Sequence, residues 1–133
     1  LLQASLHLLK QHLQRLPETN PFEKFRARLE TDLLWLANEP LTTFHQYSFA
    51  TLRQFGACYE VAAGYLQWLR DQGIDGLDQA AESALSIATA AKTFQFQLAR
   101  SMARKKPLDL QPIDQMAAHW TTIAEQLKAR FLS

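Results

Sequence analysis

The sequence has little of what holds small secreted domains or β-sheet proteins together. Its 133 residues include one cysteine, Cys58, so no internal disulfide can form, and valine and isoleucine together occur only five times. No run approaches the roughly 18 apolar residues that a transmembrane helix needs, and the first apolar stretch lacks the cleavage site of a signal peptide. These absences argue against a secreted, sheet-based or membrane-spanning protein, and the cytoplasm becomes the expected location by default.

The chain also lacks an excess of either charge. Fourteen lysines and arginines stand against thirteen aspartates and glutamates, which leaves a net charge of +1. The basic residues Lys24, Arg26 and Arg28 alternate with the acidic residues Glu23, Glu30 and Asp32, a pattern typical of a solvated and self-neutralising helix face. We therefore expect neither a nucleic acid nor a membrane as partner.

Leucine and alanine dominate, with 22 and 19 copies, and both favour helices. Apolar residues recur at helical spacing, and Asn20 with Pro21 forms a helix-start signal, while Pro17 and Pro107 act as stops. We expect helices over residues 2–16, 21–38, 42–72, 78–106 and 112–131. The predicted fold is all-α: a five-helix, mainly antiparallel bundle whose two long central helices are 42–72 and 78–106.

The two central helices have narrow polar stripes. In 42–72 the stripe contains Gln46, Arg53, Glu60, Gln67 and Asp71, with Ala57 and Gly64 between them. In 78–106 it contains Glu82, Ser86, Thr93, Gln97, Arg100 and Arg104. Because most of the remaining surface is apolar, we expect the other three helices to cover this pair on more than one side.

Polar residues outside these stripes are the pocket candidates. If the turn at Gly73–Gly76 pairs the central helices, residues whose numbers add up to about 150 lie level. A polar layer of Thr51, Gln54, Gln95 and His119, drawn from three helices, then becomes possible inside the bundle. One interpretation is a self-satisfied hydrogen-bond network, or side chains that turn outward at helix edges; the other is a small-molecule or acyl-chain pocket with Tyr59 and Tyr65 among its walls. The candidates are His45, Tyr47, Thr51, Gln54, Gln95 and His119.

Catalytic and metal-binding patterns are missing. The four histidines form no His-x-x-x-His or Glu-x-x-His pair, so we expect no metal, and the four isolated glycines give no phosphate-binding loop or other cofactor motif. Cys58 lies in mid-helix without a histidine close enough to activate it, and we interpret it as a buried thiol. No catalytic constellation is present, which leaves open whether the protein is an enzyme.

A basic cluster ends the second central helix. Arg100, Arg104, Lys105 and Lys106 carry the charge that a helix C-terminus prefers, so one interpretation is a solvated helix end. The other is a surface for an acidic protein partner.

Two segments resemble a known family. They are Phe-His-Gln-Tyr-Ser-Phe-Ala-Thr-Leu-Arg-Gln-Phe-Gly-Ala at 44–57 and Ala-Lys-Thr-Phe-Gln-Phe-Gln-Leu-Ala-Arg at 91–100. Both look like the C-terminal part of an uncharacterised bacterial family encoded beside aminoacyl carrier-protein ligases and small carrier proteins. Members are longer, so the resemblance implies that residues 1–133 are a single helical domain, the C-terminal fragment of a longer protein. It implies no catalytic residues.

These observations lead to two functional hypotheses. The first is a non-catalytic binding or interaction domain, in which helix 2–16 contacts a missing N-terminal region or another copy of the chain. The alternative is an accessory domain of a carrier-protein-dependent acyl or aminoacyl transfer system, with a small pocket between helices and an acidic carrier protein at the basic cluster.

Overall fold

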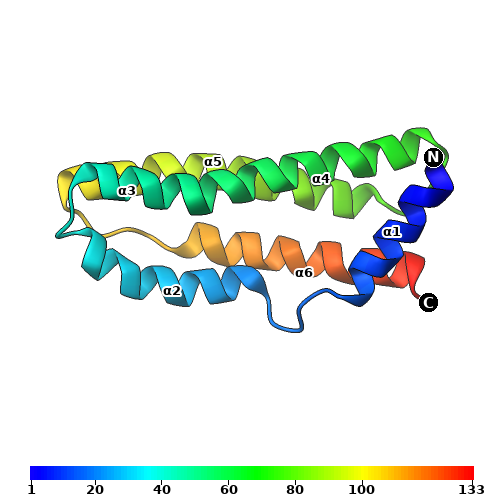
Figure 1. Ribbon diagram of the computed structural model, residues 1–133, viewed down its shortest axis with the longest axis horizontal. Helices are drawn as coiled ribbons and strands as arrows, with labels where there is room; N and C mark the ends of the chain where they lie inside the picture. The colour runs from blue at the N-terminus through cyan, green and yellow to red at the C-terminus, as the bar shows by residue number, and fades with distance from the viewer.

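The structure, a computed structural model, describes residues 1–133 and is entirely helical, as the sequence predicts. Its elements are α1 (Leu2–Gln14), α2 (Pro21–Leu36), α3 (Leu41–Ser48), the π-helical segment η1 (Phe49–Arg53), α4 (Gln54–Asp71), α5 (Asp78–Arg104) and α6 (Gln111–Phe131). Because α3, η1 and α4 follow one another without a break, they form a single long helix (Figure 1). The predicted count of five helices and the all-α class are confirmed.

Four of the five helices run lengthwise in a mainly antiparallel bundle. The α3–η1–α4 helix lies along α5, α6 returns beside α5, and α2 packs against α6, while α1 crosses the end of the bundle near the turn from α4 to α5 (Figure 1). Aromatic rings join α2 to α4, with the centroids of Phe22 and Phe55 5.1 Å apart. The α2 helix is therefore held from two sides.

The start of α2 follows the predicted capping signal. The Asn20 side-chain oxygen accepts a hydrogen bond from the backbone N–H of Phe22 at 2.9 Å, with Pro21 in the first helical position. The amide nitrogen of Asn20 also donates to the carbonyl of Ala117 at 2.8 Å and to the Thr121 hydroxyl at 3.2 Å, both on α6. One side chain thus caps α2 and ties it to α6.

The core consists of two apolar clusters placed one after the other along the bundle. The larger centres on Phe22, Leu29, Phe94, Leu98 and Met116, which are all at most 1% exposed. The smaller lies toward α1 and contains Leu13, Leu66, Leu69, Leu77 and Leu127. The apolar residues that recur at helical spacing along α2 and α6 face these clusters. A helix that is buried on one side shows this spacing directly in its sequence.

The π-helical segment is the main local feature that the periodicity did not predict. In a π-helix each backbone hydrogen bond joins residues five apart instead of four. Side chains after η1 therefore point in other directions, relative to those before it, than a regular α-helix predicts. Leu52 remains fully buried, while Phe49, expected on the apolar side, is 55% exposed.

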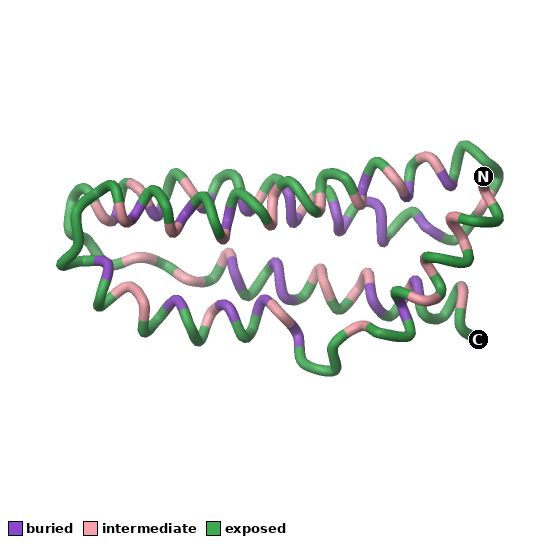
Figure 2. Tube along the Cα trace, in the orientation of Figure 1, coloured by how far each residue is buried: buried purple, intermediate pink, exposed green.

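The outer faces of α4 and α5 carry no covering helix, contrary to the expectation that three helices surround this pair. Only Ala63, Leu66 and Leu69 of α4 are buried, and exposed residues recur at each turn along that helix (Figure 2). Cys58, expected to be a buried thiol, is exposed. The physical reason is that α2 and α6 pack on the opposite side and α1 reaches only the end of α4.

Candidate binding site

The six pocket candidates do not form one polar layer. His45 and Gln54 are exposed, whereas Tyr47, Thr51, Gln95 and His119 are partly buried. The polar contacts differ: the Tyr47 hydroxyl donates to Asp32 on α2 at 2.9 Å, and the Thr51 hydroxyl donates to the carbonyl of Tyr47 at 2.8 Å.

The remaining two candidates lie on opposite sides of α5. The Gln95 amide is 3.5 Å from the Ser48 hydroxyl, on the side of α3, and a ring nitrogen of His119 is 3.1 Å from the Ser83 hydroxyl, on the side of α6. Ser83 and Gln95 are twelve residues apart on α5, about 18 Å along the helix axis, so the two pairs do not meet. The expected layer depended on a regular helical phase across residues 42–72, and η1 changes that phase.

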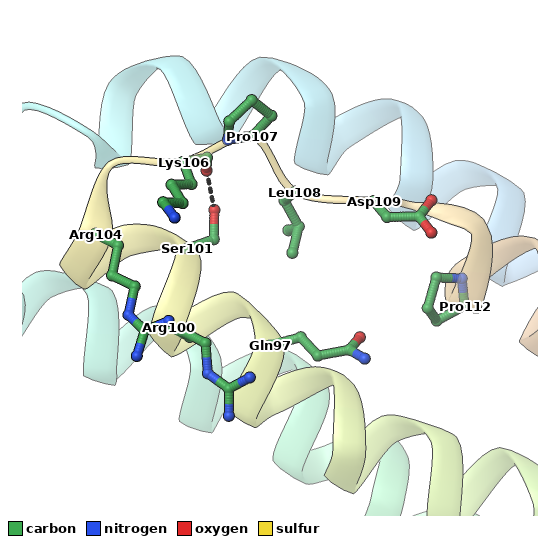
Figure 3. Close-up of a pocket in the computed structure, with 9 residues that line it drawn as sticks. All are labelled: Gln97, Arg100, Ser101, Arg104, Lys106, Pro107, Leu108, Asp109 and Pro112. Atoms are coloured by element: carbon green, nitrogen blue, oxygen red, sulfur yellow. Dashed lines mark hydrogen bonds between the residues drawn. The ribbon is translucent and has the colours of Figure 1, made fainter.

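Three of the four basic residues predicted as a partner surface line one hollow. The hollow lies between the C-terminal end of α5 and the segment that leads to α6, and it has a volume of about 260 Å³. Arg100 and Arg104 approach it from α5, and Lys106 from the following turn (Figure 3). Its other lining residues are Gln97, Ser101, Pro107, Leu108, Asp109 and Pro112.

A defined turn holds the basic residues in place. Lys105 adopts the left-handed conformation with φ of 51° and ends α5. The backbone N–H of Lys106 then donates to the carbonyl of Ser101 at 3.1 Å, and the Ser101 hydroxyl donates to the carbonyl of Lys106 (Figure 3). Ser101 is buried, so the rim that carries Lys105 and Lys106 is fixed to the helix from within.

The positive charge of the hollow is not neutralised inside the chain. The intramolecular ion pairs involve Arg26, Arg28, Arg70 and Arg130, and none involves the four basic residues at the end of α5. Asp109 is the one acidic residue that lines the hollow. Its carboxylate accepts the backbone N–H of Gln111 at 3.0 Å and points away from the two arginines (Figure 3).

A second cavity, of about 370 Å³, lies between α1, α4 and α6. Its lining residues are Ser5, Leu8, Leu9, His12, Tyr59, Ala62, Tyr65, Leu66, Ile123 and Leu127. At the edge of this cavity the Tyr65 hydroxyl donates a hydrogen bond to the Ser5 hydroxyl at 3.2 Å. Burial raises the pKa of the Tyr59 phenol to about 12. Sequence reasoning named these two tyrosines as walls, but it missed the leucines of α1 because they looked like an ordinary core seam.

Catalytic geometry is not apparent around either cavity. No group of three or more histidine, cysteine, aspartate or glutamate side chains lies close enough together to hold a metal ion. None of the helices has the length and hydropathy needed to cross a membrane. The linings of the two cavities differ in chemistry: the first carries positive charge and hydrogen-bond donors, and the second is mostly apolar.

Comparison with known proteins gives one match. The family model described as the DUF1839 C-terminal domain matches residues 1–129. No curated protein and no solved structure matches the chain.

Proposed function

The chain belongs to the DUF1839 C-terminal domain family, and from the basic hollow that it carries we propose that it is a non-catalytic interaction domain which binds an acidic protein. The observation that supports this proposal is the group of Arg100, Arg104 and Lys106 around one hollow, with no carboxylate paired to them. Unpaired cations on a fixed rim favour binding of carboxylate or phosphate groups, because little ordering is needed when the partner arrives.

The attraction is expected to be local, because the chain as a whole has a net charge of only +1. The electric field of the whole chain therefore attracts an acidic partner only weakly, and the basic end of α5 orients that partner instead. A small acidic carrier protein has this chemistry, and its phosphopantetheine arm carries a phosphate that fits the arginines. The proposed location is the cytoplasm of a bacterium.

The basic hollow makes a specific prediction for binding. The triple variant Arg100→Gln, Arg104→Gln, Lys106→Gln is expected to bind a purified acyl carrier protein about 10- to 100-fold more weakly than the unaltered chain, because three charge-assisted contacts are lost. Isothermal titration calorimetry at low and high salt measures the change. Binding of the unaltered chain is expected to weaken with salt, and the triple variant to respond less.

A matched control removes the same charge elsewhere. Lys10, Lys24 and Lys128 are exposed and lie on three other helices, so their triple glutamine variant has the same net charge as the hollow variant. Its affinity is expected to stay within about twofold of the unaltered chain. Equal weakening by both variants, or no binding by the unaltered chain, would contradict the proposed role of the hollow.

The apolar cavity favours a second candidate function, the binding of an aliphatic chain such as a fatty acyl group. The supporting observation is its lining, in which leucines, isoleucine and tyrosine rings surround about 370 Å³. This volume falls in the range of small-molecule sites. The cavity lies where α1 crosses α4 and α6 (Figure 1).

Filling the cavity tests this second candidate. The variant Ala62→Trp places an indole among the lining residues and is expected to lower the affinity for a fluorescent long-chain fatty acid at least about tenfold, because the apolar volume is taken up. The control Ala118→Trp adds the same ring at an exposed position on α6. Fluorescence titration compares them, and the candidate is rejected if both variants bind equally or if the unaltered chain shows no saturable binding.

A further inference from the structure

The uncovered face of the α4 and α5 pair is a groove with apolar side chains along it. The groove has a volume of about 610 Å³, and its lining is mixed: the charged residues Arg53, Glu60 and Lys92 lie beside the apolar residues Leu85 and Phe96. Leu85 is 50% exposed and Phe96 67% exposed, while Phe49, one turn before Arg53, is 55% exposed. Large apolar side chains collected on one face of a small protein mark a contact surface. This face is separate from the basic hollow of the proposed function.

The total exposed surface agrees with a missing contact. The chain exposes 8451 Å², whereas a folded monomer of 15.2 kDa is expected to expose about 7,100 Å². A standard protein interface covers about 800 Å² of each partner. The additional exposed surface is therefore large enough for one such interface.

The charges on α4 are arranged to match a second copy of the same helix. Arg53 and Glu60 are seven residues apart, two helical turns on one side, and the midpoint between them falls at Gly56 and Ala57. If a second α4 packs antiparallel across a twofold axis at that midpoint, Arg53 of each copy lies against Glu60 of the other. Neither residue has an ion-pair partner within the chain, and the Arg53 guanidinium lies over the exposed Phe49 ring, 5.2 Å from its centroid.

The shapes along α4 have the same symmetry. Gly64 has nothing within 4 Å of the place where a Cβ would lie, so it leaves an open notch on the helix. Phe49 and Gly64 are equally far from the same midpoint. The axis that pairs the charges therefore brings the exposed Phe49 ring of one copy onto the Gly64 notch of the other, and the small, exposed residue Ala57 allows close approach at the axis.

The α5 helix gives independent support for this axis. A Cβ added to Gly56 would lie 3.7 Å from the Ala88 carbonyl oxygen and 3.8 Å from the Ala91 side chain, which places the midpoint of α4 level with residues near 90 of α5. Leu85 and Phe96 lie about equally far on either side of that level. The same rotation therefore brings Leu85 of one copy against Phe96 of the other.

The geometry points to a homodimer in which the α4 and α5 faces of two copies pack antiparallel, with Arg53 paired to Glu60 across the twofold axis. Such an interface is isologous, so each contact occurs twice. The apolar pair of Leu85 and Phe96 supplies burial, and the ionic pair fixes the register, because a shift along the helices would bring like charges together. The chain is thus its own partner on this face.

Charge reversal and mixing test the dimer. Sedimentation equilibrium of the 133-residue chain is expected to show a mass that approaches twice 15.2 kDa as concentration rises. Arg53→Glu alone places a second carboxylate beside Glu60 of the other copy, and Glu60→Arg alone places two arginines together. Each single variant is expected to dimerise at least about tenfold more weakly, since both symmetric pairs become repulsive.

An equimolar mixture of the two single variants is expected to recover the dimer. One copy then carries two acidic residues and the other two basic ones, so both pairs are attractive again, as they are in the double variant R53E/E60R. Circular dichroism checks that each variant keeps its helices. A chain that stays monomeric at every concentration, or single variants whose mixture does not associate, would overturn the inference and leave the groove to a different partner.

Discussion

Replacing Phe94 by alanine is expected to lower the free energy of unfolding by about 3–5 kcal/mol, the usual cost of removing a buried phenylalanine ring. Phe94 is fully buried in the larger core cluster, where it lies among Leu52, Leu98 and Met116. The residues around it come from four helices, so the cavity left by the ring cannot collapse by moving one of them. Because small domains have only about 5–15 kcal/mol of stability, this loss is a large fraction of the total. Urea unfolding followed by circular dichroism measures it.

Phe96 provides a matched control for Phe94. It is the same residue type two positions later on the same helix, but it is 67% exposed. The variant Phe96→Ala is expected to change the free energy of unfolding by less than about 0.5 kcal/mol. Both measurements belong at low protein concentration, because Phe96 lies in the proposed dimer interface. Equal destabilisation by the two variants would mean that the packing of α5 is not as described.

The variant Asn20→Ala is expected to cost about 2–4 kcal/mol of stability, a large value for a single polar side chain. The cap on the Phe22 N–H alone accounts for about 1 kcal/mol. The same change removes the two donated hydrogen bonds to Ala117 and Thr121 of α6, each worth about 0.5–1.5 kcal/mol. Thermal and urea unfolding both measure the loss.

Two further variants separate the cap of Asn20 from its link to α6. Asn20→Asp keeps the oxygen that accepts from Phe22 but loses both donors, so an intermediate cost is expected. Asn38→Ala is the control, because the Asn38 amide is exposed and makes a single 3.3 Å bond to the Leu34 carbonyl. It is expected to cost less than about 0.5 kcal/mol. A cost as large as that of Asn20→Ala would show that burial is not what makes Asn20 important.

Much of the fold could be predicted because it depends on local chemistry. Asn20 followed by Pro21 fixes the start of α2 through a single side-chain bond, and that prediction is confirmed. The inward positions of α2 and α6 follow from helical periodicity, which burial imposes directly on the sequence. The end of α5 was placed within two residues, since Pro107 cannot continue a helix.

The placement of the candidate site residues depended on information that the sequence does not carry locally. The predicted polar layer required a regular α-helix through residues 42–72. The hydrogen bonds of η1 instead join residues five apart, and no proline or glycine marks that segment. Cys58 was predicted to be buried, yet its exposure depends on which helices pack against α4. The basic cluster could be recognised in the sequence because its four residues end a helix, whereas the shape of the rim depends on the Ser101 bonds to Lys106.

The exposure of Cys58 gives the chain a single chemical handle. It is the only sulfhydryl among 133 residues, and it stands on the surface of α4 within two residues of the proposed twofold axis. A thiol-reactive spin label or fluorophore therefore attaches at one known position without any mutation. In a dimer the two labels lie close together, so electron–electron coupling or energy transfer between them reports association directly in the unaltered sequence.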